Sequence, residues 1–168
     1  IVNNYNMQLY RATKRKDEVI EPQKVHPTDY HKFPDEKRPE KVIWAASIKE
    51  EALMHGLMNG ESYSLGIESK ENSSGDSQFV SGCLKSKKPL EELFAGRFDE
   101  KIYLYEFNAQ GFTQVGNGSE YYKEGEIKDF TTKTYTVVET IQLLKESNVE
   151  FRVENQFPSE SQVEVKLS

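Results

Sequence analysis

The side chains best suited to binding or catalysis occupy three distant positions in this sequence. Arg11 ends a short hydrophobic segment near the start of the chain, Ser47 follows the apolar segment 41–46, and Glu120 follows a glycine-bearing segment. A guanidinium binds phosphate or diol oxygens through two donors at once, whereas a carboxylate supplies a negative charge. We expect elements that are far apart in the sequence to bring these three side chains to one site.

Other reactive side chains carry weaker signals. His26 and His31 share a polar segment with two aspartates, but their spacing matches no known set of metal ligands, so we expect no metal site. Cys83 is the single cysteine, which excludes an intramolecular disulfide, and a buried inert thiol is a commoner role for it than a nucleophile. His55 lies on a face of an expected helix, where a packed or surface histidine is the usual case. The glycines follow neither the P-loop nor the dinucleotide-binding spacing.

Length and composition limit the possible classes of protein. The 168 residues fit one domain, which we expect to span residues 1–157. The net charge of −6 argues against a nucleic-acid backbone as the main partner, because such binding depends on clustered Lys and Arg. No apolar run approaches the roughly 20 residues that span a bilayer, and no signal peptide is visible. These features predict a cytoplasmic protein that does not enter a membrane.

Two polar segments stand out from the rest of the chain. Residues 13–41 hold four of the six prolines and many charges, and we expect a long polar loop there. Residues 158–168 are expected to form a polar tail or an edge strand. In the second case the alternation of Val163, Val165 and Leu167 would allow pairing with a partner protein.

Short strands and helices are expected in mixed order. Segments rich in β-branched and aromatic residues predict strands at 7–12, 41–46, 63–67, 78–83, 101–107, 119–122, 130–138 and 149–153. Helices are predicted at 47–60, 89–94 and 139–147. The spacing of Ser47 and Glu50 predicts a capping box at the start of the first helix. Because regular β–α–β alternation is absent, we expect an α+β fold with a mostly antiparallel sheet.

Four motifs together resemble the ADP-ribosyltransferase superfamily, and more narrowly a group of small bacterial and phage proteins. The resemblance follows the order of the elements through Val153. It implies an α+β fold whose mostly antiparallel sheet is split, with a few short helices. The motifs are LYRA at 9–12, RPEKVIWAASIKEEAL at 38–53, KIYLYEF at 101–107 and SEYYKEGEIKDF at 119–130.

The resemblance implies an NAD-binding site. Arg11 stands where the superfamily has an Arg or His that holds the ribose or phosphate of NAD. Ser47 and Tyr30 would line the pocket, and Tyr121 could stack on nicotinamide or on a target side chain. NAD would be consumed as a substrate, and no metal is implied.

The resemblance also implies a catalytic glutamate. Glu120 is the first candidate, and Glu124 or Glu126 comes next. Such a carboxylate would stabilise the oxocarbenium-like ribose as nicotinamide leaves. The reaction would be ADP-ribosyl transfer to a protein or small-molecule acceptor, or NAD glycohydrolysis.

A catalytically inactive domain of the same fold, acting as a protein-binding module, is the alternative. Ala45 and Ala46 stand where the superfamily has hydroxyl residues, which favours this alternative. An open cleft that holds Arg11 together with a late glutamate would favour chemistry. A cleft filled by Trp44 or Tyr121 would favour the inactive domain.

Overall fold

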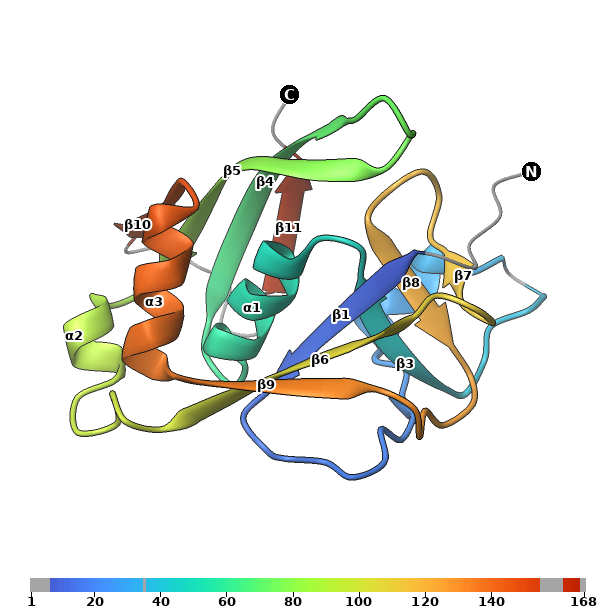
Figure 1. Cartoon of the computed structure of the whole chain (residues 1–168), viewed down its shortest axis with the longest axis horizontal. Helices are drawn as coiled ribbons and strands as arrows, with labels where there is room; N and C mark the ends of the chain where they lie inside the picture. The colour runs from blue at the N-terminus through green and yellow to red at the C-terminus, as the bar shows by residue number, and fades with distance from the viewer. Residues whose placement is uncertain (1–6, 35, 155–161, 167–168) are drawn as a thin grey trace.

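The computed structural model describes residues 7–34, 36–154 and 162–166, which fold into two β-sheets with short helices between and beside them (Figure 1). The fold is α+β and mostly antiparallel, as the sequence predicts. Among the described residues, the parallel pairs are β10 with β5 and β11 with β4, and both lie in the smaller sheet.

The larger sheet has seven strands in the order β7-β8-β3-β1-β6-β9, and β2 pairs with β3 beside this path. It carries all four motifs on neighbouring strands, in the order β8-β3-β1-β6. Its strands are β1 (Gln8–Thr13), β2 (Gln23–Lys24), β3 (Lys41–Ala46), β6 (Lys101–Asn108), β7 (Thr113–Gln114), β8 (Glu120–Lys123) and β9 (Thr131–Thr136).

The smaller sheet has four strands in the order β10-β5-β4-β11. Its last strand falls within the segment for which the sequence predicts a tail or an edge strand, and it pairs with β4 at the edge of the sheet. Its strands are β4 (Tyr63–Glu71), β5 (Ser77–Ser86), β10 (Val149–Val153) and β11 (Gln162–Lys166).

Helix α1 (Lys49–Met58) lies between the two sheets and contacts strands of both (Figure 1). Helix α3 (Val137–Glu146) packs beside α1, and α2 (Leu90–Leu93) is a single short turn. A 3-10 helix, η2 (Pro27–Lys32), interrupts the polar segment 13–41. Within the described residues, no helix is long and apolar enough to cross a membrane.

The two faces of the larger sheet pack against different cores. Successive side chains of a strand point to opposite faces. One face, which carries Ala46 and Leu104, packs against α1 and the smaller sheet. The other face carries Leu9, Ala45 and Tyr105 and is covered by loops that contribute further apolar side chains. This division decides which site residues can meet.

The predicted capping box at Ser47 is wrong. Helix α1 begins at Lys49, its N-cap is Ile48, and no side chain caps it. The reason is tertiary: the backbone N–H of Ser47 donates at 2.9 Å to the carbonyl oxygen of Ser119, the residue before β8, so Ser47 is tied to the β8 segment and does not cap the helix.

Two other predicted boundaries also differ from the structure. The segment 13–41 is not structureless, because β2 and η2 lie within it and Phe33 is buried. The strand predicted at 130–138 ends at Thr136, where α3 begins. Thr136 accepts a hydrogen bond from the N–H of Glu139, whose carboxylate accepts one from the N–H of Thr136.

Replacing Glu139 by glutamine is expected to make the stability of the protein less sensitive to acid. Hydrogen bonds from Thr136 hold the pKa of Glu139 below its ordinary value. A lowered folded-state pKa stabilises the fold above the unfolded-state pKa of about 4.3, and this contribution is lost as the pH falls through the folded-state pKa. Thermal unfolding of both proteins between pH 7 and pH 3 measures the difference. Glu146→Gln, at the other end of α3, is the control for the loss of a carboxylate that does not belong to the capping box.

Candidate anion-binding site beside Arg11

Arg11 lies where two central strands of the larger sheet separate. Strand β1 pairs with β3 at Tyr10–Ala46, and the Arg11 guanidinium then reaches across to the Trp44 carbonyl oxygen at 3.1 Å. On its other side Arg11 is opposite Tyr105 of β6. The arginine therefore bridges two strands through its side chain, which is partly buried.

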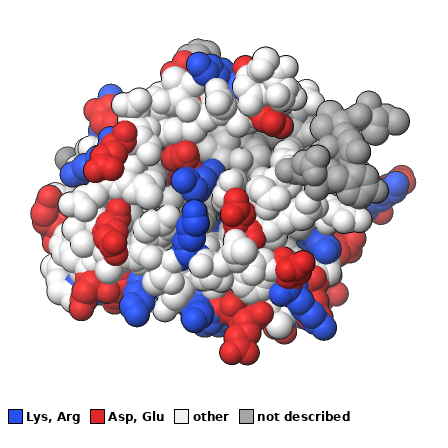
Figure 2. All heavy atoms as spheres, viewed as in Figure 1, with Lys and Arg blue, Asp and Glu red and all other residues white. Residues whose placement is uncertain are grey.

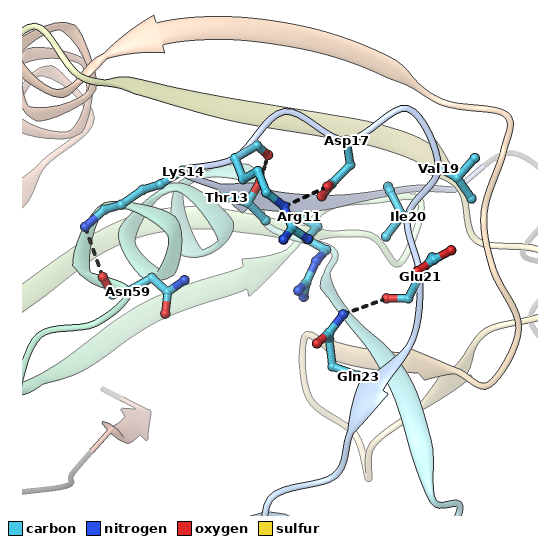
Figure 3. A pocket seen from close by; sticks show the side chains of 10 residues that line it. Arg11, Thr13, Lys14, Asp17, Val19, Ile20, Glu21, Gln23 and Asn59 are labelled. Atoms are coloured by element: carbon cyan, nitrogen blue, oxygen red, sulfur yellow. Dashed lines mark hydrogen bonds and ion pairs between the residues drawn. The ribbon is translucent and has the colours of Figure 1, made fainter.

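The loop after β1 builds a pocket in front of Arg11 (Figure 3). The Tyr105 hydroxyl holds this loop: it accepts from the N–H of Asp17 at 2.6 Å and donates to the carbonyl oxygen of Arg15 at 2.9 Å. The pocket has a volume of about 480 Å³. It is lined by Arg11, Thr13, Lys14, Arg15, Asp17, Val19, Ile20, Glu21, Gln23 and Asn59.

Positive charge in the pocket is only partly balanced by its own carboxylates. Asp17 forms its ion pair with Arg15, at 3.1 Å. Among the described residues, Arg11 has no ion pair, and the carbonyl oxygen of Trp44 accepts the one hydrogen bond that its side chain donates. Burial lowers the pKa of Arg11, although Asp17 and Tyr105 act in the opposite direction. A desolvated guanidinium of this kind favours an anion as its missing partner.

Lys14 adds a second basic group at one end of the pocket. Its ammonium donates to the carbonyl oxygen of Asn59 at 3.0 Å and lies 5.6 Å from the centre of the Phe94 ring. Burial and the nearby charge of Arg97 lower the pKa of Lys14. The two basic groups come from alternate faces of the chain where β1 ends, and Figure 3 shows them on either side of Thr13.

The structure places the three residues of the sequence hypothesis on, or directly after, neighbouring strands. Ser47 directly follows β3, and Glu120 is the first residue of β8. Glu120 pairs with Ala46, which pairs in turn with Tyr10. Arg11 is the next residue after Tyr10, so Arg11 and Glu120 point to opposite faces of the sheet.

Glu120 forms an ion pair with Lys32, the last residue of η2. The Lys32 ammonium lies 2.9 and 3.1 Å from the two carboxylate oxygens of Glu120 and 3.1 Å from Asp29. Glu124 and Glu126 follow β8 in an exposed turn. The three candidate glutamates therefore have different surroundings: Glu124 and Glu126 are exposed, whereas Glu120 is partly buried and paired with Lys32.

The predicted aromatic residues of the pocket pack elsewhere. Tyr121 is 6% exposed and belongs to the core on the Arg11 face of the sheet, where its hydroxyl lies 3.8 Å from the Met7 sulfur. Burial raises its pKa. Tyr30 packs against the cluster around Phe33, and the Arg38 guanidinium lies 3.6 Å from the centre of its ring. Neither tyrosine lines the pocket.

His26 and His55 form hydrogen bonds within the fold, and Cys83 is partly buried. His26 is the N-cap of η2 and accepts from the N–H of Thr28 at 3.2 Å. His55 and Tyr63 share a hydrogen bond of 2.7 Å. Burial raises the pKa of the half-buried Cys83. No group of three or more His, Cys, Asp or Glu residues within the described part of the chain is arranged to hold a metal ion.

Sequence reasoning missed Lys14, Arg15 and Lys32 as partners of the site. The first two lie within a few residues of Arg11, so the basic run Arg11–Arg15 was a visible signal. Lys32 acts across 88 positions of sequence, and no local pattern reports such a contact. Elsewhere the surface mixes charges of both signs on the face drawn in Figure 2, with no broad basic patch there.

The buried Ser119–Glu51 pair joins β8 to α1, and its loss is expected to destabilise the protein. Ser119 Oγ lies 2.7 and 3.0 Å from the two Glu51 oxygens, and both side chains are buried. Ser119→Ala removes a donor to a buried carboxylate and should cost about 1–3 kcal/mol of unfolding free energy. Urea denaturation measures it. Ser81→Ala is the matched control, because its bond to Glu68 is longer, at 3.3 Å, and half-exposed.

Comparisons with family models, with curated proteins and with solved structures find no match for this chain.

Proposed function

We propose that the protein is an ADP-ribosyltransferase-like domain that binds NAD, with a phosphate or a ribose diol of the ligand at Arg11. The desolvated Arg11 guanidinium is the observation that carries the proposal. Its side chain donates one hydrogen bond within the described residues, and it faces a pocket with further basic groups. An anionic ligand would supply the partner that the guanidinium lacks, and the planar fork suits phosphate and vicinal hydroxyls alike.

The size of the pocket and its uncharged side chains support a nucleotide as the ligand. A volume of about 480 Å³ is within the range of small-molecule sites. Thr13, Gln23 and Asn59 bring a hydroxyl and two amides, which can donate to and accept from ribose hydroxyls. Val19, which is partly exposed, adds apolar surface on which a base or a sugar face can rest.

Binding without turnover is the form of the proposal that the geometry supports best. Glu120 could stabilise an oxocarbenium-like ribose only if it faced the same ligand as Arg11, but the register sends it to the other side of the sheet. Lys32 already neutralises its carboxylate. The chain would then be a catalytically inactive domain that acts by binding NAD or a partner protein.

ADP-ribosyl transfer or NAD glycohydrolysis is the second candidate. One observation favours it: Arg11 lies on β1, Ser47 directly follows β3 and Glu120 begins β8, and these three strands are neighbours in the larger sheet. In this case NAD is the substrate and Glu120 faces the positive charge that develops when nicotinamide leaves. Lys32 would have to release Glu120 first.

Titration calorimetry with NAD, followed by an assay for released nicotinamide on the same sample, tests both candidates. Binding without release supports the inactive domain, and binding with release supports the enzyme. Inorganic pyrophosphate and adenosine, titrated separately, distinguish recognition of the phosphates from recognition of the nucleoside. If NAD does not bind at millimolar concentration, both candidates fail.

A further inference from the structure

Lys32 occupies a receptor for a positive charge on the face of the sheet opposite the Arg11 pocket. Its ammonium contacts both oxygens of Glu120 and one oxygen of Asp29, and it lies 5.1 Å from the centre of the Trp44 ring. A cation within about 6 Å of an indole face is attracted by the ring. Carboxylates and an aromatic face are the groups by which proteins recognise ammonium and guanidinium ions.

The receptor and the lysine that fills it belong to different parts of the fold. Glu120 of β8 pairs with Ala46 of β3, and Trp44 lies two residues before Ala46, so the sheet holds both side chains on the same face. Lys32 and Asp29 come from η2. When the lysine side chain moves away, Glu120 and Trp44 stay in place, because Trp44 is packed against Phe33 and Tyr122 at ring distances of 5.6 and 5.9 Å.

The lysine can leave without unfolding the loop that carries it. Phe33 is 5% exposed and anchors the end of η2, so only the lysine stem needs to rotate. Lys32, Asp29 and Glu120 have side chains that are 24%, 27% and 26% exposed, which leaves a route for exchange with a ligand from solvent. The contact between Lys32 and Glu120 is therefore partly open to solvent.

The charge of the cluster favours a cation over any other ligand. Two carboxylates face one ammonium, so a negative charge remains while Lys32 is bound. Burial alone would lower the pKa of Lys32, but Glu120 and Asp29 outweigh it and raise that pKa. The net charge of −6 further attracts a basic ligand toward the protein.

From these observations we infer that Glu120 and Trp44 bind a lysine or arginine side chain of a partner protein, and that Lys32 fills this receptor until the partner displaces it. The site lies on the opposite face of the sheet from Arg11. It does not depend on whether NAD binds.

The test uses Trp44, the single tryptophan of the chain, as a fluorescent reporter. Lys32→Ala empties the receptor, and the variant is titrated with Nα-acetyl-lysine methylamide, Nα-acetyl-arginine methylamide and the uncharged Nα-acetyl-norleucine methylamide at constant ionic strength. The inference expects a saturable change in fluorescence with the two basic probes and no saturable change with norleucine. In wild type the same change should require at least about tenfold more probe, because Lys32 competes.

Matched variants separate the receptor from general charge effects. Lys32→Ala combined with Glu120→Gln should bind the basic probes at least about tenfold more weakly than Lys32→Ala. Lys128→Ala removes an exposed lysine and should behave like wild type. If Lys32→Ala does not fold, Lys32→Met keeps the stem packing and still leaves Glu120 without its cation. An equal response to norleucine, or an unchanged response after Glu120→Gln, would overturn the inference.

Discussion

Replacing Arg11 by methionine is expected to weaken NAD binding by about 30- to 150-fold. This corresponds to about 2–3 kcal/mol, the usual contribution of a charge-assisted hydrogen bond that is shielded from water. The Arg11 guanidinium has no ion pair with a carboxylate among the described residues, so its loss removes a strong attraction for a phosphate. Calorimetric titration of both proteins with NAD measures the effect.

Two further variants show whether the charge or the fork of Arg11 matters. Arg11→Lys keeps the positive charge but cannot bind two oxygens in parallel, so we expect about a tenfold loss of affinity. Arg152→Met is the matched control, because this arginine is exposed, pairs with Glu150 at 2.8 Å and lies in the smaller sheet. Its NAD affinity should equal that of wild type.

The bridging role of Arg11 has to be separated from binding. The side chain also joins β1 to β3 through the Trp44 carbonyl oxygen, so Arg11→Met will lower the melting temperature to some extent. If Arg11→Met stays folded and binds NAD as tightly as wild type does, the pocket is not the nucleotide site.

Strands with a strong local pattern could be predicted closely from the sequence. The segments KVIWAA and VEFRV coincide with β3 and β10, and KIYLYEF differs from β6 by one residue. Alternation of apolar and polar residues marks such strands because one face of each is buried. The polar segment 13–41 shows the opposite case: β2 and η2 depend on contacts with β3 and on the buried Phe33, which no local pattern reveals.

The capping-box spacing occurs twice in the sequence, and the two cases show that a local pattern does not decide the local structure alone. Ser47 and Thr136 are each followed by a glutamate three residues later, but only Thr136 forms the capping box. Ser47 instead donates its backbone N–H to the carbonyl oxygen of Ser119, which precedes the distant strand β8. A capping motif reports the local preference, and the tertiary hydrogen bond prevails over it.

The strands that carry the candidate residues could be predicted from the sequence, but the face of the sheet to which each side chain points could not. The sequence predicts strands at 7–12, 41–46 and 119–122, and the corresponding strands β1, β3 and β8 are neighbours in the larger sheet. Which face each side chain takes depends on the register, since a shift by one residue reverses every side chain. The pairs Tyr10–Ala46 and Ala46–Glu120 decide it, and no sequence pattern gives a register between distant strands.

The approach of α1 to β1 leads to the second large prediction, that Gly56→Ala destabilises the protein. In an isolated helix this change stabilises by up to about 1 kcal/mol. Here the added Cβ would lie 2.5 Å from the Cβ of Ala12 and 2.9 Å from its carbonyl carbon and oxygen. Since backbone atoms cannot rotate away, steric repulsion outweighs the helical preference. We expect a net loss of about 2–3 kcal/mol.

The position of Gly56 connects this stability effect to the proposed pocket. Ala12 directly follows Arg11 on β1, so displacement of Ala12 should move the guanidinium and weaken NAD binding as well. The melting temperature should fall by about 4–12 °C. Gly82→Ala is the control: its Cβ would meet the ends of Phe79 and Met54 at 3.2 and 3.3 Å, and these flexible side chains can adjust. Unfolding and NAD titration of both variants give the answer. A Gly56→Ala protein as stable as wild type would mean that α1 lies farther from β1 than the structure shows.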